Sequence, residues 1–414
     1  MTDALPDLPE RLVGRFFRYL SIATQSDARA TTLPSTPGQW DLARLLQAEL
    51  EALGLSDIHL DANCVLTARL PGTAEAAPRI GFCAHLDTVD VGLSPDIRPQ
   101  RIRFDGSDLV LSPDCTMRVA EHPELLPYRG QELIVTDGTS VLGADDKAAI
   151  TVVMELLQTL AREKAAHGDV VVAFVPDEEI GLRGAKAMDL ARFPVDFAYT
   201  IDCCAVGEFV CETFNAAQAT IRIQGVTAHP MSAKGVMVNP VLVATDLIGR
   251  LDPRQTPEHT EGRDGYWWVN GVVADAAEAT LTVSIRDFDA DGFARRKRVL
   301  EEVVAAVAAA HPRAVLSLRL VDLYANPAGA LAAEPRAAAL MRAAYEQAGI
   351  APEIIAMRGG TDGSALSARG VPTPNMFTGA LNFHSPFEFL PVPSFVASYR
   401  VAEGIVSLAA RSGR

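Results

Sequence analysis

Acidic residues and histidines recur directly after the short apolar runs of this 414-residue sequence, or at the start of a helical pattern. The runs read as buried strands of an α/β sheet, and such sheets place their ligand sites at the carboxyl ends of strands. Several carboxylates gathered at one edge repel one another, and a bound cation offsets that repulsion. Two histidines with several carboxylates favour a divalent metal, zinc first, with manganese or cobalt as alternatives. The residues concerned are His85, Asp87, Asp145, Glu178, Glu179, Asp202 and His384.

The stretch VPDEEIG (175–181) places three adjacent carboxylates after VVVAF, a run that looks fully buried. Repulsion and desolvation both disfavour this arrangement unless some of the side chains serve a cation. In the stretch HLD, His85 and Asp87 point to the same side of an extended chain, so Asp87 can orient the imidazole. For Asp177 the neighbouring residues indicate no role, and we expect it to face solvent or to pair locally.

Each of these residues has a plainer interpretation when it is taken alone. An Asp at a helix start is usually a cap, and a His in a loop is usually solvated. Their convergence on strand ends favours a metal site, in which a bridging carboxylate would hold two ions about 3.5–4 Å apart. The six cysteines form no CxxC pair, so we expect reduced thiols. Cys203 and Cys204 lie beside Asp202 and could ligate a metal as thiolates, but small buried side chains are the commoner case and the one that we expect.

The elements that must position these side chains alternate between helix and strand in the first half of the chain. The segment Ala144–Ala161 has the apolar spacing of one helix face and follows Gly143, which suits a tight turn. Asp145 and Asp146 then lie in the first turn, where the helix dipole favours negative charge. This alternation predicts an α/β domain. The other helical patterns cover about 8–21 and 38–54, and the strand-like runs cover 79–85, 169–176 and 197–204.

The pattern changes near residue 214 and becomes β-α-β-β-α-β until about residue 326. That order predicts a ferredoxin-like unit long enough to fold as a domain of its own. The predicted fold class is therefore α/β, with a mixed sheet flanked by helices in a catalytic domain of residues 1–213 plus 327–414. An inserted α+β lid domain of residues 214–326 interrupts it. The one basic run, 295–298, lies in a helical pattern and is typical of a solvated helix face.

Composition excludes several classes of partner. A net charge of −15 argues against a nucleic-acid partner, which would need clustered Lys and Arg. No apolar run approaches the roughly 18 residues of a membrane span. The N-terminus MTDALPDLPERL is acidic where a secretory signal would be basic and then apolar, so we expect a cytoplasmic protein.

Several short motifs are spread along nearly the whole chain: HLDT (85–88), TDGTSVLGADDKAA (136–149), PDEEIG (176–181), RGGTDGSALS (358–367) and FTGALNFH (377–384). They resemble, in the same order, those of the peptidase T family, which consists of dinuclear zinc tripeptide aminopeptidases. PSTPGQW (34–40), FNAAQATIRIQGVTAHPMSAKGVMVN (214–239) and IRDFD (285–289) match as well.

The resemblance implies roles for the acidic residues and histidines. Two zinc ions per subunit would be held by five ligands, with Asp145 bridging them and a cis peptide bond between Asp145 and Asp146. Glu178 would be the general base, and Asp87 would belong to the catalytic group by orienting His85. The implied ligands are His85, Asp145, Glu179, Asp202 and His384.

The resemblance also implies substrate-binding residues. His229, Asn239 and Arg286 match lid positions of the family that help to bind substrate, and His229 could stabilise the developing oxyanion. We expect the forked guanidinium of Arg286 to hold the C-terminal carboxylate, with Arg358 and Lys147 as weaker candidates. Met231 and the pair Cys203-Cys204 replace glycines that the family usually has, which bears on the size and polarity of the pocket.

The predicted function is hydrolysis of the N-terminal peptide bond of tripeptides by a metallo-aminopeptidase. Its partner would be a short peptide, and the chain would be a monomer or a homodimer. A related zinc carboxypeptidase, dipeptidase or N-acyl amino acid deacylase is the alternative, because the same metal set serves all of these. A non-catalytic binding module is the third hypothesis, and the presence of a free base at Glu178 argues against it.

Overall fold

The computed structural model describes residues 7–74 and 76–412, which divide into two compact units. Unit 1 comprises the described residues up to Cys211, the segment Pro327–Ile355 and the described residues from Thr361 onward. Unit 2 comprises Glu212–Asn326 and Ala356–Gly360. Unit 2 therefore interrupts unit 1 along the sequence.

An eight-stranded mixed sheet of order β1-β2-β8-β3-β9-β16-β10-β15 lies at the centre of the larger unit. Its central strands β8, β3, β9 and β16 are parallel, so their carboxyl ends meet at one edge. This mixed sheet with its flanking helices confirms the predicted fold class. The strands are β1 (Ser56–Leu60), β2 (Leu66–Leu70), β3 (Ile80–His85), β8 (Val170–Val175), β9 (Phe197–Cys203), β10 (Glu208–Thr213), β15 (Glu353–Met357) and β16 (Asn375–Phe377).

The central strands are apolar without alternation because both of their faces are covered. All six residues of β8, VVVAFV, are buried, as expected for a strand inside a parallel sheet with helices on both sides. In β3, a Cβ atom at Gly81 would lie 2.4 Å from Cζ of Phe193, so only glycine lets that ring pack against the strand. Both strands thus run through the core and emerge at the edge where the candidate residues lie.

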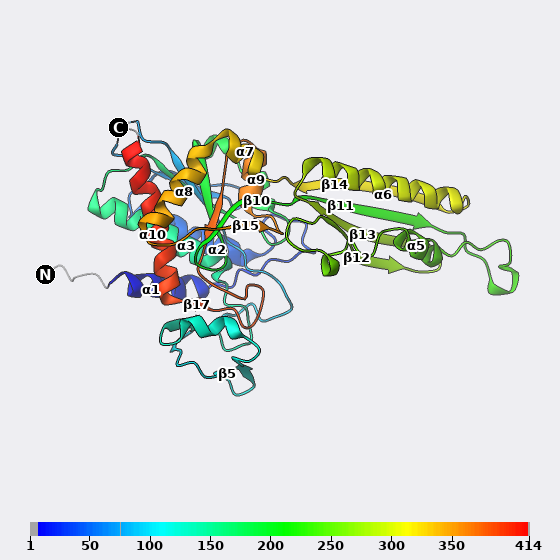
Figure 1. The fold of residues 1–414 in the computed structure, drawn as a ribbon, viewed down its shortest axis with the longest axis horizontal. Helices are drawn as coiled ribbons and strands as arrows, with labels where there is room; N and C mark the ends of the chain where they lie inside the picture. Colours follow the sequence, from blue (N-terminus) through cyan, green and yellow to red (C-terminus); the bar gives the residue numbers. More distant parts are fainter. Residues whose placement is uncertain (1–6, 75, 413–414) are drawn as a thin grey trace. The chain divides into compact units, whose positions relative to one another are not determined.

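The helices of unit 1 cover the sheet with apolar faces (Figure 1). Helix α1 buries Leu12, Phe16 and Leu20, which lie on one face, and Phe16 meets Phe395 of α10 with ring centroids 5.5 Å apart. Among the described residues, no helix combines the length and the apolarity that a membrane span requires. The helices are α1 (Leu8–Leu20), α2 (Pro37–Ala52), α3 (Ala144–Glu163), α4 (Arg183–Ala187), α7 (Ala328–Ala333), α8 (Pro335–Gln347), α9 (Asp362–Ala368) and α10 (Val392–Ser412).

The segment between β3 and α3 contains short strands that the sequence did not predict. A three-stranded sheet of order β17-β7-β4 and a hairpin of β5 and β6 share an apolar cluster that includes Phe104, Leu133 and Phe389. Strands of two to four residues are too short to display a period, which is why periodicity missed them. The strands of this segment are β4 (Gln100–Arg103), β5 (Leu109–Ser112), β6 (Cys115–Met117) and β7 (Glu132–Val135), and β17 (Leu390–Pro391), which directly precedes α10, pairs with β7.

Unit 2 has the predicted element order, β-α-β-β-α-β, around a four-stranded antiparallel sheet of order β12-β13-β11-β14. On β11, Ile221 and Ile223 are buried with the apolar residues of α5 and α6, whereas Arg222 and Gln224 are exposed. Figure 1 shows α6 running alongside β14 and β11. The elements are β11 (Asn215–Gln224), α5 (Pro240–Gly249), β12 (Tyr266–Ala274), β13 (Glu278–Asp287), α6 (Ala290–Ala310) and β14 (Val315–Tyr324).

Candidate metal centre

Asp145 lies between two histidines that come from opposite ends of the sequence. One carboxylate oxygen, Oδ1, is 2.9 Å from Nε2 of His85, and the other, Oδ2, is 3.0 Å from Nε2 of His384. The same nitrogen of His384 is 2.9 Å from Oε1 of Glu179. A carboxylate that offers one oxygen to each side is arranged as a bridging ligand would be.

The donor atoms form three overlapping groups in which all atoms lie within 4.8 Å of one another. Asp145 and His85 each belong to two groups, so the groups are continuous. All five predicted ligands, and Glu178 with them, are thus brought together by unit 1. The groups are His85 with Asp145, Asp146 and Asp202; His85 with Glu178 and Glu179; and Asp145 with Glu179 and His384.

The pKa shifts reveal an excess of negative charge in this cluster. Burial, and then the charge of Asp145, raises the pKa of Glu179 to about 7 and the pKa of Asp202 well above its usual range. Burial lowers the pKa of His384, but hydrogen bonds to Asp145 and Glu179 outweigh it and raise that pKa to about 11. A divalent cation among these oxygens and imidazoles would offset the repulsion, and the donor types fit zinc.

The local backbone before α3 turns Asp145 toward the two histidines. Gly143 adopts a left-handed conformation with φ of 72°, which a residue with a side chain disfavours. Asp145 has a non-helical ψ of 98°, and the peptide bond that joins it to Asp146 is cis, as the resemblance implies. The carboxylate of Asp146 turns the other way and accepts a hydrogen bond from the backbone N–H of His85 at 3.1 Å.

Asp87 is fully buried and contacts the backbone that follows β8 as well as His85. Its carboxylate accepts hydrogen bonds from the backbone N–H groups of Glu178 at 2.9 Å and Glu179 at 3.2 Å. Nδ1 of His85 lies 2.9 Å from the main-chain carbonyl oxygen of Asp87 and 3.5 Å from its carboxylate. The shortest contact with His85 therefore comes from the backbone of Asp87, and the side chain fixes the turn that bears the two glutamates.

Glu178 and Glu179 are adjacent but their carboxylates have different surroundings. Glu179 pairs with His384, whereas the carboxylate of Glu178 accepts no hydrogen bond from the part of the chain that is described. Glu178 is 9% exposed, and burial raises its pKa well above the usual range of a glutamate. A buried, unengaged carboxylate with a raised pKa is suited to accept and return a proton.

The expectation that Asp177 faces solvent is wrong, and its local pair with Arg183 is only part of its contacts. Its side chain is fully buried and accepts hydrogen bonds from Ser35 Oγ at 2.6 Å, from Ser35 N at 2.8 Å and from Gln39 Nε2 at 2.7 Å. Arg183 forms an ion pair with it at 3.2 Å. The partners Ser35 and Gln39 precede it by 142 and 138 residues, so no local pattern could have revealed them.

Two further buried side chains hold the backbone of proposed ligands and were not predicted. The side chain of Asn375 on β16 forms two hydrogen bonds with the backbone of Asp202. Its Oδ1 accepts from Asp202 N at 2.8 Å, and its Nδ2 donates to Asp202 O at 2.9 Å. Glu388 accepts hydrogen bonds from the backbone at the start of α3. A lone Asn in a short strand or a lone Glu in a loop carries no signal of such partners, which lie far away in sequence.

The four predicted substrate-binding residues belong to unit 2. His229 and Asn239 are exposed, and each accepts a hydrogen bond from the backbone two residues on, Asn239 as the cap of α5. Arg286 donates through Nη1 to the carbonyl oxygens of Ala217 and Ile285, which leaves Nε and Nη2 without a partner in the described chain. Those two nitrogens are the fork that a carboxylate could occupy.

The other two cationic candidates, Arg358 and Lys147, donate hydrogen bonds to other groups of the protein. Arg358 donates to the carbonyl oxygens of Gly262 and Asp264 and to Oγ1 of Thr260. Because these contacts occupy both terminal nitrogens of Arg358, Arg286 is the better candidate to bind the C-terminal carboxylate of a substrate. The expectation for Lys147 is wrong, since this side chain is fully buried and donates to the carbonyl oxygen of Ile22 at 2.6 Å. Burial lowers the pKa of Lys147 to about 7.

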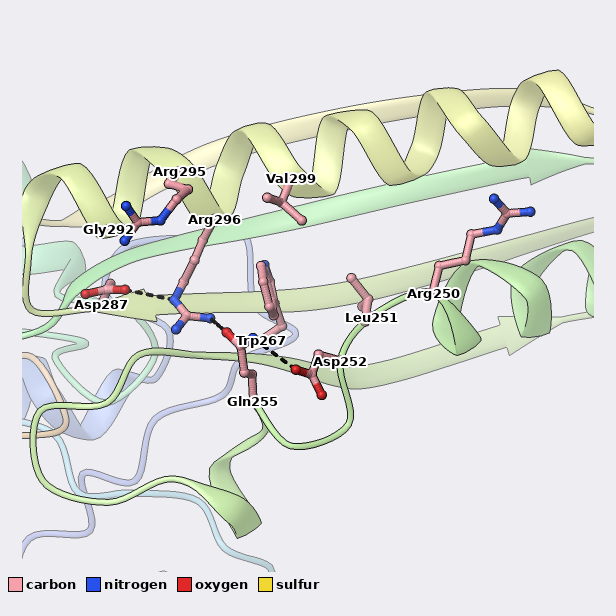
Figure 2. A pocket seen from close by; sticks show the side chains of 10 residues that line it. All are labelled: Arg250, Leu251, Asp252, Gln255, Trp267, Asp287, Gly292, Arg295, Arg296 and Val299. Carbon is pink, nitrogen blue, oxygen red and sulfur yellow. Dashed lines mark hydrogen bonds and ion pairs between the residues drawn. The ribbon is translucent and has the colours of Figure 1, made fainter.

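A cavity of about 360 Å³ lies on unit 2, and none of the candidate residues lines it (Figure 2). Figure 2 shows Arg296 reaching from α6 to Asp287 and Gln255, at 2.8 and 2.9 Å. Its guanidinium also lies 4.6 Å from the ring centre of Trp267. Arg296 thus departs from the solvated face expected for the basic run, and its contacts tie α6 to the sheet.

The sequence profile of peptidase family M20/M25/M40 matches residues 120–407. The chain belongs to this family. A peptidase T-like protein of Yersinia pestis is 58% identical over 407 residues, which cover 98% of this chain and 99% of that protein. Peptidase T of Geobacillus thermodenitrificans is 40% identical over 406 residues, covering 97% and 98% respectively. The resemblance to peptidase T that the motifs indicated is therefore confirmed.

Solved structures of two peptidases share the fold. Aminopeptidase PepT from Bacillus cereus superposes with a TM-score of 0.76 at 21% identity, covering 97% of this chain and 99% of its own. A tripeptidase from Staphylococcus aureus gives 0.75 at 21% identity with the same coverage. These structures show that the fold is shared, and the peptidase class follows from the sequence match.

Proposed function

We propose that this protein is a dinuclear zinc aminopeptidase that releases the N-terminal residue of tripeptides. The observation that carries the proposal is the position of Asp145 between His85 and His384, with the unengaged carboxylate of Glu178 in the same cluster. The names of relatives that match nearly the whole chain support the tripeptide substrate.

Five residues would hold the metal ions, with Asp145 shared between them. When bound, two divalent ions would lower the pKa of water and polarise a peptide carbonyl. Manganese or cobalt could replace zinc, since the same donors serve all three. The proposed ligands are His85, Asp145, Glu179, Asp202 and His384.

Glu178 is the proposed proton carrier. Its carboxylate takes a proton from the attacking water and returns it to the leaving amine, which departs as a neutral group. The raised pKa of Glu178 brings its proton affinity closer to that of water and amine during the reaction. Glu179 cannot share this task while its carboxylate is engaged with His384.

Substrate selection would fall to residues of unit 2. Arg286 would bind the C-terminal carboxylate of a short peptide with the two nitrogens that the protein leaves unoccupied. His229 would stabilise the negative charge that develops on the peptide oxygen, and Asn239 would contribute to binding. The six free cysteines fit a reducing compartment, for which we propose the cytoplasm.

The alternative, a related carboxypeptidase, dipeptidase or deacylase, differs at the ends of the substrate. An aminopeptidase accepts a free α-amine, whereas a deacylase or carboxypeptidase accepts a blocked one. Hydrolysis of Ala-Ala-Ala and of its N-acetylated form should therefore be compared with zinc-loaded protein. We expect cleavage of the free tripeptide, and cleavage of the acetylated peptide alone would overturn the proposal.

A further inference from the structure

A buried glutamate joins two of the loops that carry proposed metal ligands. Glu388 follows His384 by four residues, and it is 1% exposed. Its Oε2 accepts a hydrogen bond from Gly143 N at 2.8 Å, and its Oε1 accepts from Ala144 N at 2.9 Å and from Asp145 N at 3.3 Å. Both oxygens are therefore used, and all three donors are consecutive backbone groups that end at Asp145.

These donors are the ones that α3 cannot satisfy by itself. The first N–H groups of any helix have no partner within the helix, and a side chain at the N-cap usually provides one. Gly143, the N-cap of α3, has no side chain, so Glu388 does this from another segment. A negative charge at this end of a helix is also favoured by the helix dipole.

The segment that bears Glu388 is itself closed into a compact loop around His384. Leu381 and Phe389 pair as an isolated bridge, and Glu388 N donates to Ser385 O at 3.2 Å. Nδ2 of Asn382 donates to Phe387 O at 3.3 Å. Because hydrogen bonds close the loop at one end and the helix starts at the other, the Glu388 carboxylate links the segment of His384 to the backbone of Asp145.

We propose that Glu388 is a positioning residue of the metal centre, which holds the backbone of Asp145 at a fixed place relative to His384. The proposal rests on the proposed function, because the ligand roles of Asp145 and His384 come from it. Without this link the Asp145 carboxylate would no longer be held between the two histidines. The metal would then be bound less tightly even where the fold persists.

The test compares two glutamate-to-glutamine variants of the full chain. Glu388→Gln leaves one accepting oxygen and turns an amide N–H toward a backbone N–H. Glu155→Gln is the matched control, since Glu155 is a buried glutamate of α3 itself, is also 1% exposed and pairs with Arg11 at 2.7 Å, away from the helix start. Zinc affinity is measured by competition with a chromogenic chelator, and Tm is measured by circular dichroism.

We expect zinc affinity to fall about 10- to 100-fold in Glu388→Gln, the usual range for a group that supports a metal ligand. In Glu155→Gln, Tm should fall while zinc affinity stays within about twofold of the parent. An unchanged affinity in Glu388→Gln would overturn the proposal. An equal loss in Glu155→Gln would also overturn it, because the effect would then be a general loss of stability.

Glu388→Asp provides a second variant in case Glu388→Gln does not fold. It keeps the carboxyl group but is one methylene shorter, so it cannot reach all three donors, and a loss of zinc affinity is again expected. Parental affinity in Glu388→Asp would contradict the proposal. Zinc binding is measured without any peptide, so a parent that binds zinc but cleaves no tripeptide would sink the proposed function alone.

Discussion

The carboxylate of Asp87 accepts a hydrogen bond from the backbone N–H of Glu178 at 2.9 Å. Asp87 follows β3 and Glu178 follows β8, two neighbouring parallel strands, so one strand end fixes the turn at the other. The second oxygen of Asp87 holds Glu179 N at 3.2 Å. Asp87 thus positions the proposed base, Glu178, and the proposed ligand, Glu179, together. The geometry of the cluster therefore depends on buried side chains that bind the backbone as well as on the ligands themselves.

Glu178→Ala should separate proton transfer from metal binding. The variant removes a carboxylate that accepts no hydrogen bond from the described chain, so zinc content should stay at the parental value. The rate of tripeptide hydrolysis should fall by about 10²- to 10⁴-fold, because the variant lacks the proposed proton carrier. Glu346→Ala, at an exposed position of α8, is the control and should keep full activity. Hydrolysis at the parental rate in Glu178→Ala would show that the base is another group.

Removal of the metal should abolish activity and lower stability together. Zinc that binds only the folded state stabilises it by about 2.7 kcal/mol when free zinc is a hundred times Kd. Dialysis against a chelator should therefore lower Tm and stop hydrolysis, and added zinc should restore both. Addition of magnesium is the control and should restore little, since imidazole ligands do not favour it. A chelated protein of full activity would contradict the metal-dependent account.

Asp177→Ala should destabilise unit 1 strongly. The substitution removes the buried acceptor that Ser35 and Gln39 share and leaves Arg183 without its counter-charge. We expect the free energy of unfolding to fall by about 3 kcal/mol, as measured by urea denaturation. Asp41→Ala, which removes an exposed carboxylate on α2, should change it by less than about 0.5 kcal/mol. Equal small effects in both variants would mean that the Asp177 network contributes little.

Arg286→Ala should weaken the binding of the peptide's C-terminal carboxylate. We expect KM for a tripeptide to rise about 10-fold or more with little change in kcat, since a charged hydrogen bond contributes about 1.5–3 kcal/mol. A C-terminally amidated tripeptide is the control substrate. The parent should prefer the free acid to the amide, and the variant should lose that preference. A preserved preference would assign the carboxylate to another residue.

Much of the site could be predicted from sequence because its residues lie at the ends of strongly apolar strands. The runs that became β3, β8 and β9 are buried along their whole length, and this pattern locates His85, Glu178 and Asp202 at one sheet edge. The helix that begins after Gly143 was likewise readable from its apolar face and its turn residue. The motifs that contain His85 and Glu178 then indicated the peptidase T family.

The remaining features depend on partners that no local pattern shows. Asp177 pairs with residues more than a hundred positions earlier, and Glu388 reaches the start of α3 from near the end of the chain. Each looks in sequence like an ordinary loop carboxylate, because burial and long-range hydrogen bonds arise only when the chain folds. The short strands between β3 and α3 were missed for a different reason, since three or four residues are too few for a period.

The most direct test of the central claim is the identity of the first products from an asymmetric tripeptide such as Leu-Gly-Phe. Zinc-loaded protein should be sampled early in the reaction, and the products should be separated by liquid chromatography and identified by mass. The account predicts free Leu together with the dipeptide Gly-Phe. Release of Phe together with Leu-Gly would contradict it and would identify the protein as a carboxypeptidase.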